Sequence, residues 1–311
     1  MKLRIGTRGS ALAMAQANQV KDLLERLHPG LACELEVMKT SGDDFSAGRA
    51  AAEEAAAVKG LFVKEIEEAL LAGRVDLAVH SVKDLETDLP EGLTLGAVLK
   101  REDPRDALVL REGGSLDALP PGGRVGASSL RRQAQLKRLR RDLEMIPIRG
   151  NVDTRLKKLD AGECDALVLA ACGLKRLGLE NRISGYLDPA QFLSAAGQGA
   201  LAVEIRADRA DVAERVRALD DRDSRREVEA ERSLLRSLGG SCRVPIGALA
   251  RVTDENNMTL EGVVLSPDGL KAVRKSVSGS TRSAERLGMD LASHLRAVGA
   301  DRLLYGAWER K

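Results

Sequence analysis

Short apolar runs alternate with helical patterns from residue 1 to about residue 206. Leu3 to Gly6 forms one short run, Phe62 to Leu71 carries apolar residues at helical spacing, and Val75 to Val79 is nearly continuous in apolar residues. This alternation is typical of strands joined by crossover helices. It predicts an α/β architecture with parallel strands for this part of the chain.

A second series of strand-like runs begins near residue 105. It comprises Ala107 to Leu110, Arg124 to Ala127, Met145 to Ile148 and Ala166 to Ala170, and helical segments follow the last three. We therefore predict a second α/β domain. The late run from Leu201 to Ile205 has no place in this series, so we expect it to return to the first sheet.

The pattern changes beyond residue 220. An amphipathic helix ends at Gly239-Gly240, and three strand-like runs follow, separated by turn residues at 254–257 and 267–269. A final helix carries apolar residues at helical spacing from Ala284 to Val298. The sequence predicts a small α+β domain with a three-stranded antiparallel sheet.

The predicted organisation has three domains and two hinge crossings, near residues 100 and 200. Domain 1 comprises residues 1–99 and 200–217, domain 2 comprises 105–195, and domain 3 comprises 220–311. The length of 311 residues agrees, because one hydrophobic core rarely extends past about 250 to 300 residues. The Ala-rich segment from Ser41 to Val58 has no large apolar face, and we predict a mobile loop or lid there.

Composition and charge exclude several classes of function. The 49 Lys and Arg residues are balanced by 47 Asp and Glu, which is not the pattern of a polybasic nucleic-acid arm. Three Phe, two Tyr and one Trp are too few for the stacking platforms of single-strand binding. No run approaches the roughly 18 apolar residues of a membrane span, and the first residues lack the core of a signal peptide. We expect a cytoplasmic protein with free thiols that binds neither nucleic acid nor a membrane.

Cations and hydroxyls cluster where the predicted strands end. Ser81 to Asp84 follow one strand, Ser128 to Arg132 another and Arg149 to Arg155 a third, while Arg8 and Ser10 follow the first. Ligands of open α/β sheets bind beyond the carboxyl ends of strands. Because guanidinium groups bind planar carboxylates bidentately, the cluster predicts a ligand with several carboxylates or phosphates. As alternatives, the cations are solvated turn residues and Ser10, Ser128 and Ser129 are helix N-caps.

Three further residues have chemistry of their own. Asp84 is a single carboxylate in a cationic set, and it either pairs with Lys83 or handles protons and charge on a substrate. His80 ends an apolar strand and is interpreted as a core histidine. Cys242 lies in a glycine-rich segment beside Arg243, which favours a thiolate. It is either a nucleophile or attachment point, or an inert loop thiol.

Several motifs occur in a specific order nearly from end to end of the chain. They are Arg4 to Ser10, Lys59 to Glu65, His80 to Asp84, Arg101 to Asp106, Gly126 to Gln133, Arg149 to Arg155, Gly197 to Ala200 and Gly240 to Gly247. In this order the chain resembles the hydroxymethylbilane synthase family, also called the porphobilinogen deaminases. The resemblance implies a cytoplasmic transferase that condenses four porphobilinogen units, with loss of ammonia, into linear hydroxymethylbilane for tetrapyrrole and haem biosynthesis.

The same resemblance implies roles for individual residues. Cys242 is expected to carry, through a thioether, a dipyrromethane cofactor made from two substrate units. Asp84 is expected to assist deamination. A monomer is implied. No metal is expected, because the sequence has no His/Cys cluster at metal-ligand spacing. The residues expected to bind the acetate and propionate groups of substrate and cofactor are Arg8, Ser10, Ser81, Lys83, Ser129, Arg131, Arg132, Arg149, Arg155 and Arg176.

Two other functions fit parts of the pattern. The two predicted α/β domains are periplasmic-binding-protein-like, and two such domains with hinge crossings are also how anion-binding proteins and regulator effector domains are built. Such a module uses the arginines without needing Asp84 or Cys242. A transferase that holds a phosphate at Ser128 and Ser129, at a helix N-terminus, is the other alternative.

Overall fold

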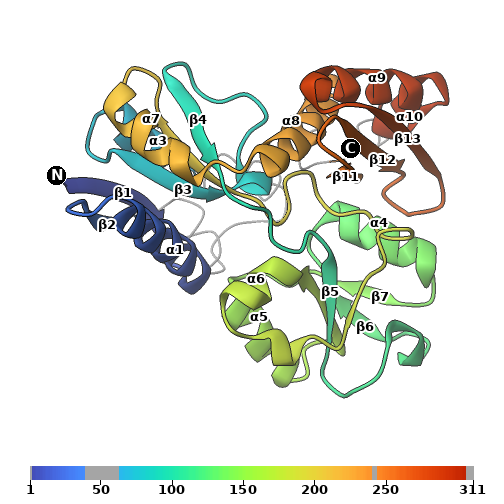
Figure 1. Cartoon of the computed structure of the whole chain (residues 1–311). Helices are drawn as coiled ribbons and strands as arrows, with labels where there is room; N and C mark the ends of the chain where they lie inside the picture. Colours follow the sequence, from blue (N-terminus) through green and yellow to red (C-terminus); the bar gives the residue numbers. More distant parts are fainter. Residues whose placement is uncertain (1, 39–62, 240–243, 306–311) are drawn as a thin grey trace. The chain divides into compact units, whose positions relative to one another are not determined.

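The computed structural model describes residues 2–38, 63–239 and 244–305 (Figure 1). The chain divides into two compact units, Met1–Glu102 with Gly199–Arg225, and Asp103–Gln198 with Arg226–Lys311. The second unit contains both the middle sheet and the C-terminal sheet, and the division into three domains stays a prediction. Cys242 and the predicted lid at 41–58 lie outside the described residues.

The first unit is built on a five-stranded sheet of order β2-β1-β3-β10-β4. Its strands are β1 (Lys2–Arg8), β2 (Ala32–Met38), β3 (Leu77–Ser81), β4 (Leu93–Val98) and β10 (Leu201–Arg206). β10 returns to the first sheet, as predicted. The expectation of parallel strands alone is wrong, because β10 pairs antiparallel with β3 and β4. The chain re-enters beside the carboxyl end of β3, where Leu201 lies opposite Ser81, and therefore runs back along it.

Helices cover both faces of this sheet. On one face α1 (Ala11–Leu27) and α7 (Ala210–Val216) share a core with β1, β3 and β10. On the other, α3 (Lys64–Leu71) packs against Ala78 of β3. Two short 3-10 turns, Val82–Asp84 and Arg217–Leu219, follow β3 and α7. Ser10 is confirmed as the N-cap of α1, since its Oγ accepts a 3.3 Å hydrogen bond from the amide of Ala13.

The middle sheet, in the second unit, has the order β7-β6-β8-β5-β9. Its strands are β5 (Asp106–Leu110), β6 (Arg124–Gly126), β7 (Glu144–Ile146), β8 (Ala166–Ala170) and β9 (Gly185–Tyr186). β6, β7 and β8 are parallel, but β5 runs antiparallel to β8, so this sheet is also mixed. α4 (Leu130–Leu139) packs on one face, and α5 (Val152–Asp160) and α6 (Ala171–Arg176) pack on the other.

The C-terminal part of the second unit has the predicted three-stranded antiparallel sheet. Its strands are β11 (Ile246–Val252), β12 (Asn257–Leu265) and β13 (Ala272–Ser280). α9 (Ala284–Ala297), α10 (Ala300–Tyr305) and the part of α8 (Arg222–Ser237) from Arg226 onward complete it, and Figure 1 shows α9 lying over β12 and β13. The predicted fold class of two α/β sheets plus a small α+β part is confirmed.

The predictions of free thiols and of no membrane span can be compared with the described residues. Cys33, Cys164 and Cys172 are free and buried, as expected for thiols that act as small apolar side chains. Within the described ranges, no helix combines the length and the apolar character that a membrane crossing requires.

Candidate active site

Five of the predicted site residues lie at one edge of the first unit's sheet. β1 and β3 are parallel neighbours, so their carboxyl ends point the same way. Arg8 is the last residue of β1 and Ser81 the last of β3, while Ser10 caps the helix that follows β1. Lys83 and Asp84 lie in the 3-10 turn directly after Ser81. The strand ends thus gather two cations, two hydroxyls and a carboxylate on one edge.

The turn after β3 is held firmly at its backbone. The amide of Val82 donates to the carbonyl of Ala200 at 3.1 Å, and the amide of Leu85 donates to Val82 at 3.2 Å. The side chains of Val82 and Leu85 are buried. Between these two apolar anchors Lys83 is half-buried and Asp84 is exposed. The Asp84 carboxylate is therefore accessible to a ligand at the sheet edge.

The other predicted residues among the described ones lie in the segments and helices that follow strands of the middle sheet. Ser129 occupies the N-cap position of α4, but its hydroxyl makes no capping hydrogen bond. Ser128 instead donates from its Oγ to the carbonyl of Ile148, so neither serine is committed to capping the helix. Arg149 precedes α5, Arg155 lies within it, and Arg176 ends α6. The Arg155 Nε donates to the carbonyl of Gly150 at 2.7 Å.

Arg131 and Arg132 share a carboxylate of the protein itself. Asp106 is fully buried, with Oδ2 at 2.7 Å from Arg131 Nη1 and Oδ1 at 2.7 Å from Arg132 Nη2. Burial acts to raise the pKa of Asp106, but the two guanidinium groups outweigh it and hold that pKa well below its usual range. Burial lowers the pKa of Arg131, and Asp106 opposes this effect. Two cations against one anion leave this group with a surplus positive charge.

Asp106 was not among the site residues predicted from the sequence. Its one local sequence signal is that it is a charged residue directly before the apolar run Ala107 to Leu110. The nearest intramolecular partners of this carboxylate are 25 and 26 residues away in the chain, so only the fold brings them together.

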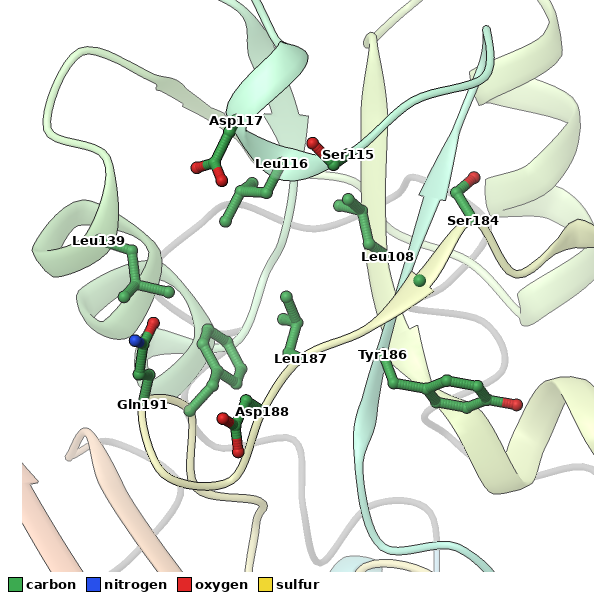
Figure 2. Close-up of a pocket in the computed structure, with 12 residues that line it drawn as sticks. Leu108, Ser115, Leu116, Asp117, Leu139, Ser184, Tyr186, Leu187, Asp188 and Gln191 are labelled. Atoms are coloured by element: carbon green, nitrogen blue, oxygen red, sulfur yellow. The ribbon is translucent and has the colours of Figure 1, made fainter.

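A cavity of about 330 Å³ in the second unit is separate from these residues. Its walls include Leu108, Leu116, Leu187 and Phe192, and no predicted site residue lines it. In Figure 2, Asp117 lies on one side of the cavity and Gln191 on the opposite side. The predicted ligand cations therefore do not face this cavity.

Cations and hydroxyls at the strand ends of two mixed α/β sheets, with an exposed carboxylate at one of them, are the arrangement of an α/β protein with a polar site at its strand ends. Residues 3–214 match the family model "Porphobilinogen deaminase, dipyromethane cofactor binding domain", and residues 225–297 match "Porphobilinogen deaminase, C-terminal domain". The chain belongs to the porphobilinogen deaminase family. It is a transferase of tetrapyrrole biosynthesis, with a domain for the dipyrromethane cofactor.

Relatives with this name are similar over nearly the whole chain. The porphobilinogen deaminase of Syntrophobacter fumaroxidans is 52% identical over 305 residues, covering 97% of this chain and 96% of that one. The porphobilinogen deaminase of Chromobacterium violaceum is 50% identical over 306 residues, covering 97% of each. This similarity sets aside the alternative of a module that binds anions without catalysis.

Solved structures with low sequence identity also align with the chain. The methionine binding protein MetQ covers 70% of this chain and 89% of its own, at 13% identity and a TM-score of 0.45. The VFT2 domain of Bordetella pertussis BvgS covers 70% and 85%, at 16% identity and a TM-score of 0.42. Similarity at this level carries no argument about the ligand of this chain.

Proposed function

We propose that the chain joins four porphobilinogen molecules head to tail, with loss of four ammonia molecules, and that one water molecule adds at release to give linear hydroxymethylbilane. The observation that carries the proposal is the exposed Asp84 carboxylate beside Lys83 at an edge that also holds Arg8, Ser10 and Ser81. Porphobilinogen bears carboxylates and a basic amine, so its groups complement cations, hydroxyls and a carboxylate at one edge.

Asp84 is assigned the catalytic role. A carboxylate at this position can accept hydrogen bonds from pyrrole N–H groups and stabilise the positive charge that develops on the substrate carbon as ammonia leaves. Arg8 and Lys83 hold the substrate carboxylates through charge-assisted hydrogen bonds, with Ser10 and Ser81 as hydroxyl donors. These contacts orient the reacting carbon toward Asp84.

The residues of the second unit fit a dipyrromethane cofactor. Arg131 and Arg132 keep a surplus positive charge over Asp106, as a ligand carboxylate requires. Ser129, Arg149, Arg155 and Arg176 complete the proposed set, and Cys242, outside the described residues, is the proposed thioether attachment point. When bound, dipyrromethane supplies the terminal pyrrole to which the first substrate unit is joined.

We also propose the substrate, the oligomeric state and the cellular location of the enzyme. We assign porphobilinogen as its substrate, a monomer as its working form and the cytoplasm as its location. Buried free thiols at Cys33, Cys164 and Cys172 are consistent with a reducing compartment.

Intact mass and turnover test the proposal together. The purified protein is expected to exceed its sequence mass by two deaminated pyrrole units on the peptide that contains Cys242, and Cys242→Ser is expected to lack this addition and all turnover.

Asp84→Ala is expected to load the cofactor but to lose a factor of about 10² to 10⁴ in rate. Asp88→Ala, an exposed carboxylate four residues away, serves as the matched control. A thiol that stays free after incubation with porphobilinogen, or a normal rate in Asp84→Ala, contradicts the corresponding assignment.

A further inference from the structure

Three ionisable side chains that the proposed reaction does not use are buried together in the first unit. His80 of β3, Glu204 of β10 and Glu67 of α3 are 6%, 0% and 8% exposed. The Nε2 of His80 lies 3.1 Å from Oε2 of Glu204. No protein group among the described residues makes a hydrogen bond to that nitrogen, to either Glu204 oxygen or to Oε1 of Glu67. Buried charges are costly unless they are paired, so each of these groups depends on the others.

Strand register places the pair on one face of the sheet. β3 and β10 are antiparallel, with Ala202 opposite His80 and Glu204 opposite Ala78. Ala78 packs against Ile66 of α3. Side chains two residues apart on a strand share a face, so His80 and Glu204 both lie on the α3 side. Their contact links β3 to β10 beneath α3.

The end of β3 is also held from the opposite face. Ser81 points to the α1 side, where its Oγ accepts a 3.0 Å hydrogen bond from Nε2 of the buried Gln16. His80 and Ser81 are consecutive, so side-chain contacts hold the end of β3 on both faces of the sheet, immediately before Lys83 and Asp84. The chain can shift there only by breaking contacts on one face or the other.

Glu67 sets the charge balance around this contact. The groups that face it are Glu204 from β10, His80 from β3 and Glu86 from the loop after the 3-10 turn. Burial, followed by Glu204, raises the pKa of Glu67 to about 7, while His80 acts to lower it. A protonated Glu67 places no like charge beside Glu204, which keeps its contact with His80.

We propose that the buried His80–Glu204 pair is a positioning device that holds Ser81, Lys83 and Asp84 in the geometry needed for reaction. The inference rests on the role proposed for Asp84. Neither His80 nor Glu204 touches the substrate in this proposal, and both act through the backbone of β3. A displacement of about 1 Å at reacting groups costs about 10²-fold in rate, so a small shift of this strand end has a large effect on turnover.

The test uses His80→Gln, Glu204→Gln and the double variant, each compared per mole of cofactor-loaded enzyme at a temperature where all are folded. His80→Gln leaves a buried carboxylate without its partner, and we expect kcat to fall about 10²-fold with KM changed less than about threefold. The double variant removes both ionisable partners, so we expect it to be faster than His80→Gln but still about tenfold slower than wild type.

Asp76→Asn is the matched control. Asp76 is another buried carboxylate of the same unit, bonded to Arg4 and Arg209 just before β3 begins. We expect it to lower the melting temperature without changing kcat. Equal losses of kcat in Asp76→Asn and in the pair variants would show a general loss of stability and overturn the positioning role.

The remaining outcomes separate this inference from the proposed function. Wild-type kcat in folded Glu204→Gln and His80→Gln, with Asp84→Ala inactive, overturns the positioning role alone. Wild-type kcat in Asp84→Ala removes the catalytic assignment on which the inference rests. If neither single variant folds, the double variant decides: a tenfold loss of kcat supports the proposal and a wild-type kcat rejects it.

Discussion

Oδ2 of Asp106 lies 2.7 Å from Nη1 of Arg131, and neither side chain is more than 5% exposed. The same Arg131 nitrogen donates to the carbonyl of Leu193 at 2.6 Å, and Gln198 donates to Oδ1 of Asp106 at 3.1 Å. These contacts fix the guanidinium by groups of the protein itself. The start of α4 is therefore ordered by internal contacts that need no ligand.

Replacing Asp106 by Asn is expected to destabilise the protein by about 3 to 5 kcal/mol, because two adjacent buried guanidinium groups lose their only shared anion among the described residues. Denaturant unfolding at pH 7 measures this. Since the pKa of Asp106 is lowered in the fold, its contribution is present above the unfolded pKa of about 4 and is lost as the pH falls below it.

Asp160→Asn, in an exposed pair with Arg182, is the control and is expected to change stability by less than about 1 kcal/mol. An equal effect of both substitutions would contradict the argument.

Replacing Glu67 by Gln is expected to change how stability depends on pH. The pKa of Glu67 is raised from 4.5 to about 7 by burial and by Glu204. Between these values the folded protein keeps a proton that the unfolded chain has released, so wild-type stability falls as the pH rises from 4.5 to about 7. Melting temperatures should therefore favour Glu67→Gln over wild type more at pH 8 than at pH 5.

The neighbour Glu68 provides the control for this pH dependence. Its side chain is 58% exposed beside Lys64, so Glu68→Gln should follow wild type at both pH values. A difference between wild type and Glu67→Gln that does not vary with pH would rule out the buried proton.

Replacing Glu231 by Gln is expected to weaken the second unit. Its two carboxylate oxygens accept from the amides of Gly197 at 2.6 Å and Ala250 at 2.7 Å. A glutamine offers one oxygen and turns its NH₂ group toward the other amide, which leaves a buried donor facing a donor. We expect a loss of about 2 to 3 kcal/mol and faster hydrogen exchange at one of the two amides. Glu227→Gln should lose less, because one amide oxygen can keep the 3.1 Å bond from Val252.

Replacing Gly288 by Ala is expected to destabilise the packing of α9 on α8. An added Cβ would lie 2.5 Å from the carbonyl oxygen of Ala230 and 2.7 Å from the amide nitrogen of Leu234, both backbone atoms that cannot move aside easily. We expect a loss of about 1 to 3 kcal/mol, despite the better helix propensity of alanine. Gly113→Ala, where a Cβ meets no atom within 4 Å, should be nearly neutral in the same thermal unfolding measurement.

Strand positions were predictable where burial is continuous. The run Ala166 to Ala170 was predicted with the bounds that β8 has, because all five residues are buried. β4 was missed, since Thr94 and Gly96 interrupt its apolar pattern. Glycine at position 96 allows close packing of β4 against α7, because an added Cβ would lie 2.7 Å from Cγ2 of Val216. Strand direction was not predictable for β5 and β10, because it depends on where the chain enters each sheet.

The gathering of the candidate site residues at strand ends was predictable from sequence because these motifs follow strands. Lys83 and Asp84, for example, come immediately after β3. The contact between the buried His80 and Glu204 was not predictable from sequence, because these residues lie far apart along the chain. Only strand pairing brings Nε2 of His80 to 3.1 Å from Oε2 of Glu204. A glutamate inside the apolar run Leu201 to Ile205 was the one local signal of such a pair.

The insertion of β10 between β3 and β4 has a consequence for the order of events during synthesis. The ribosome delivers β3 and β4 long before β10, so the first sheet stays open, with two strand edges exposed, until the middle sheet has been synthesised. Open edges are sites of mispairing. The last strand of the first unit to be made is therefore the one that closes its sheet, and a nascent chain that stalls before residue 201 presents an incomplete sheet to its surroundings.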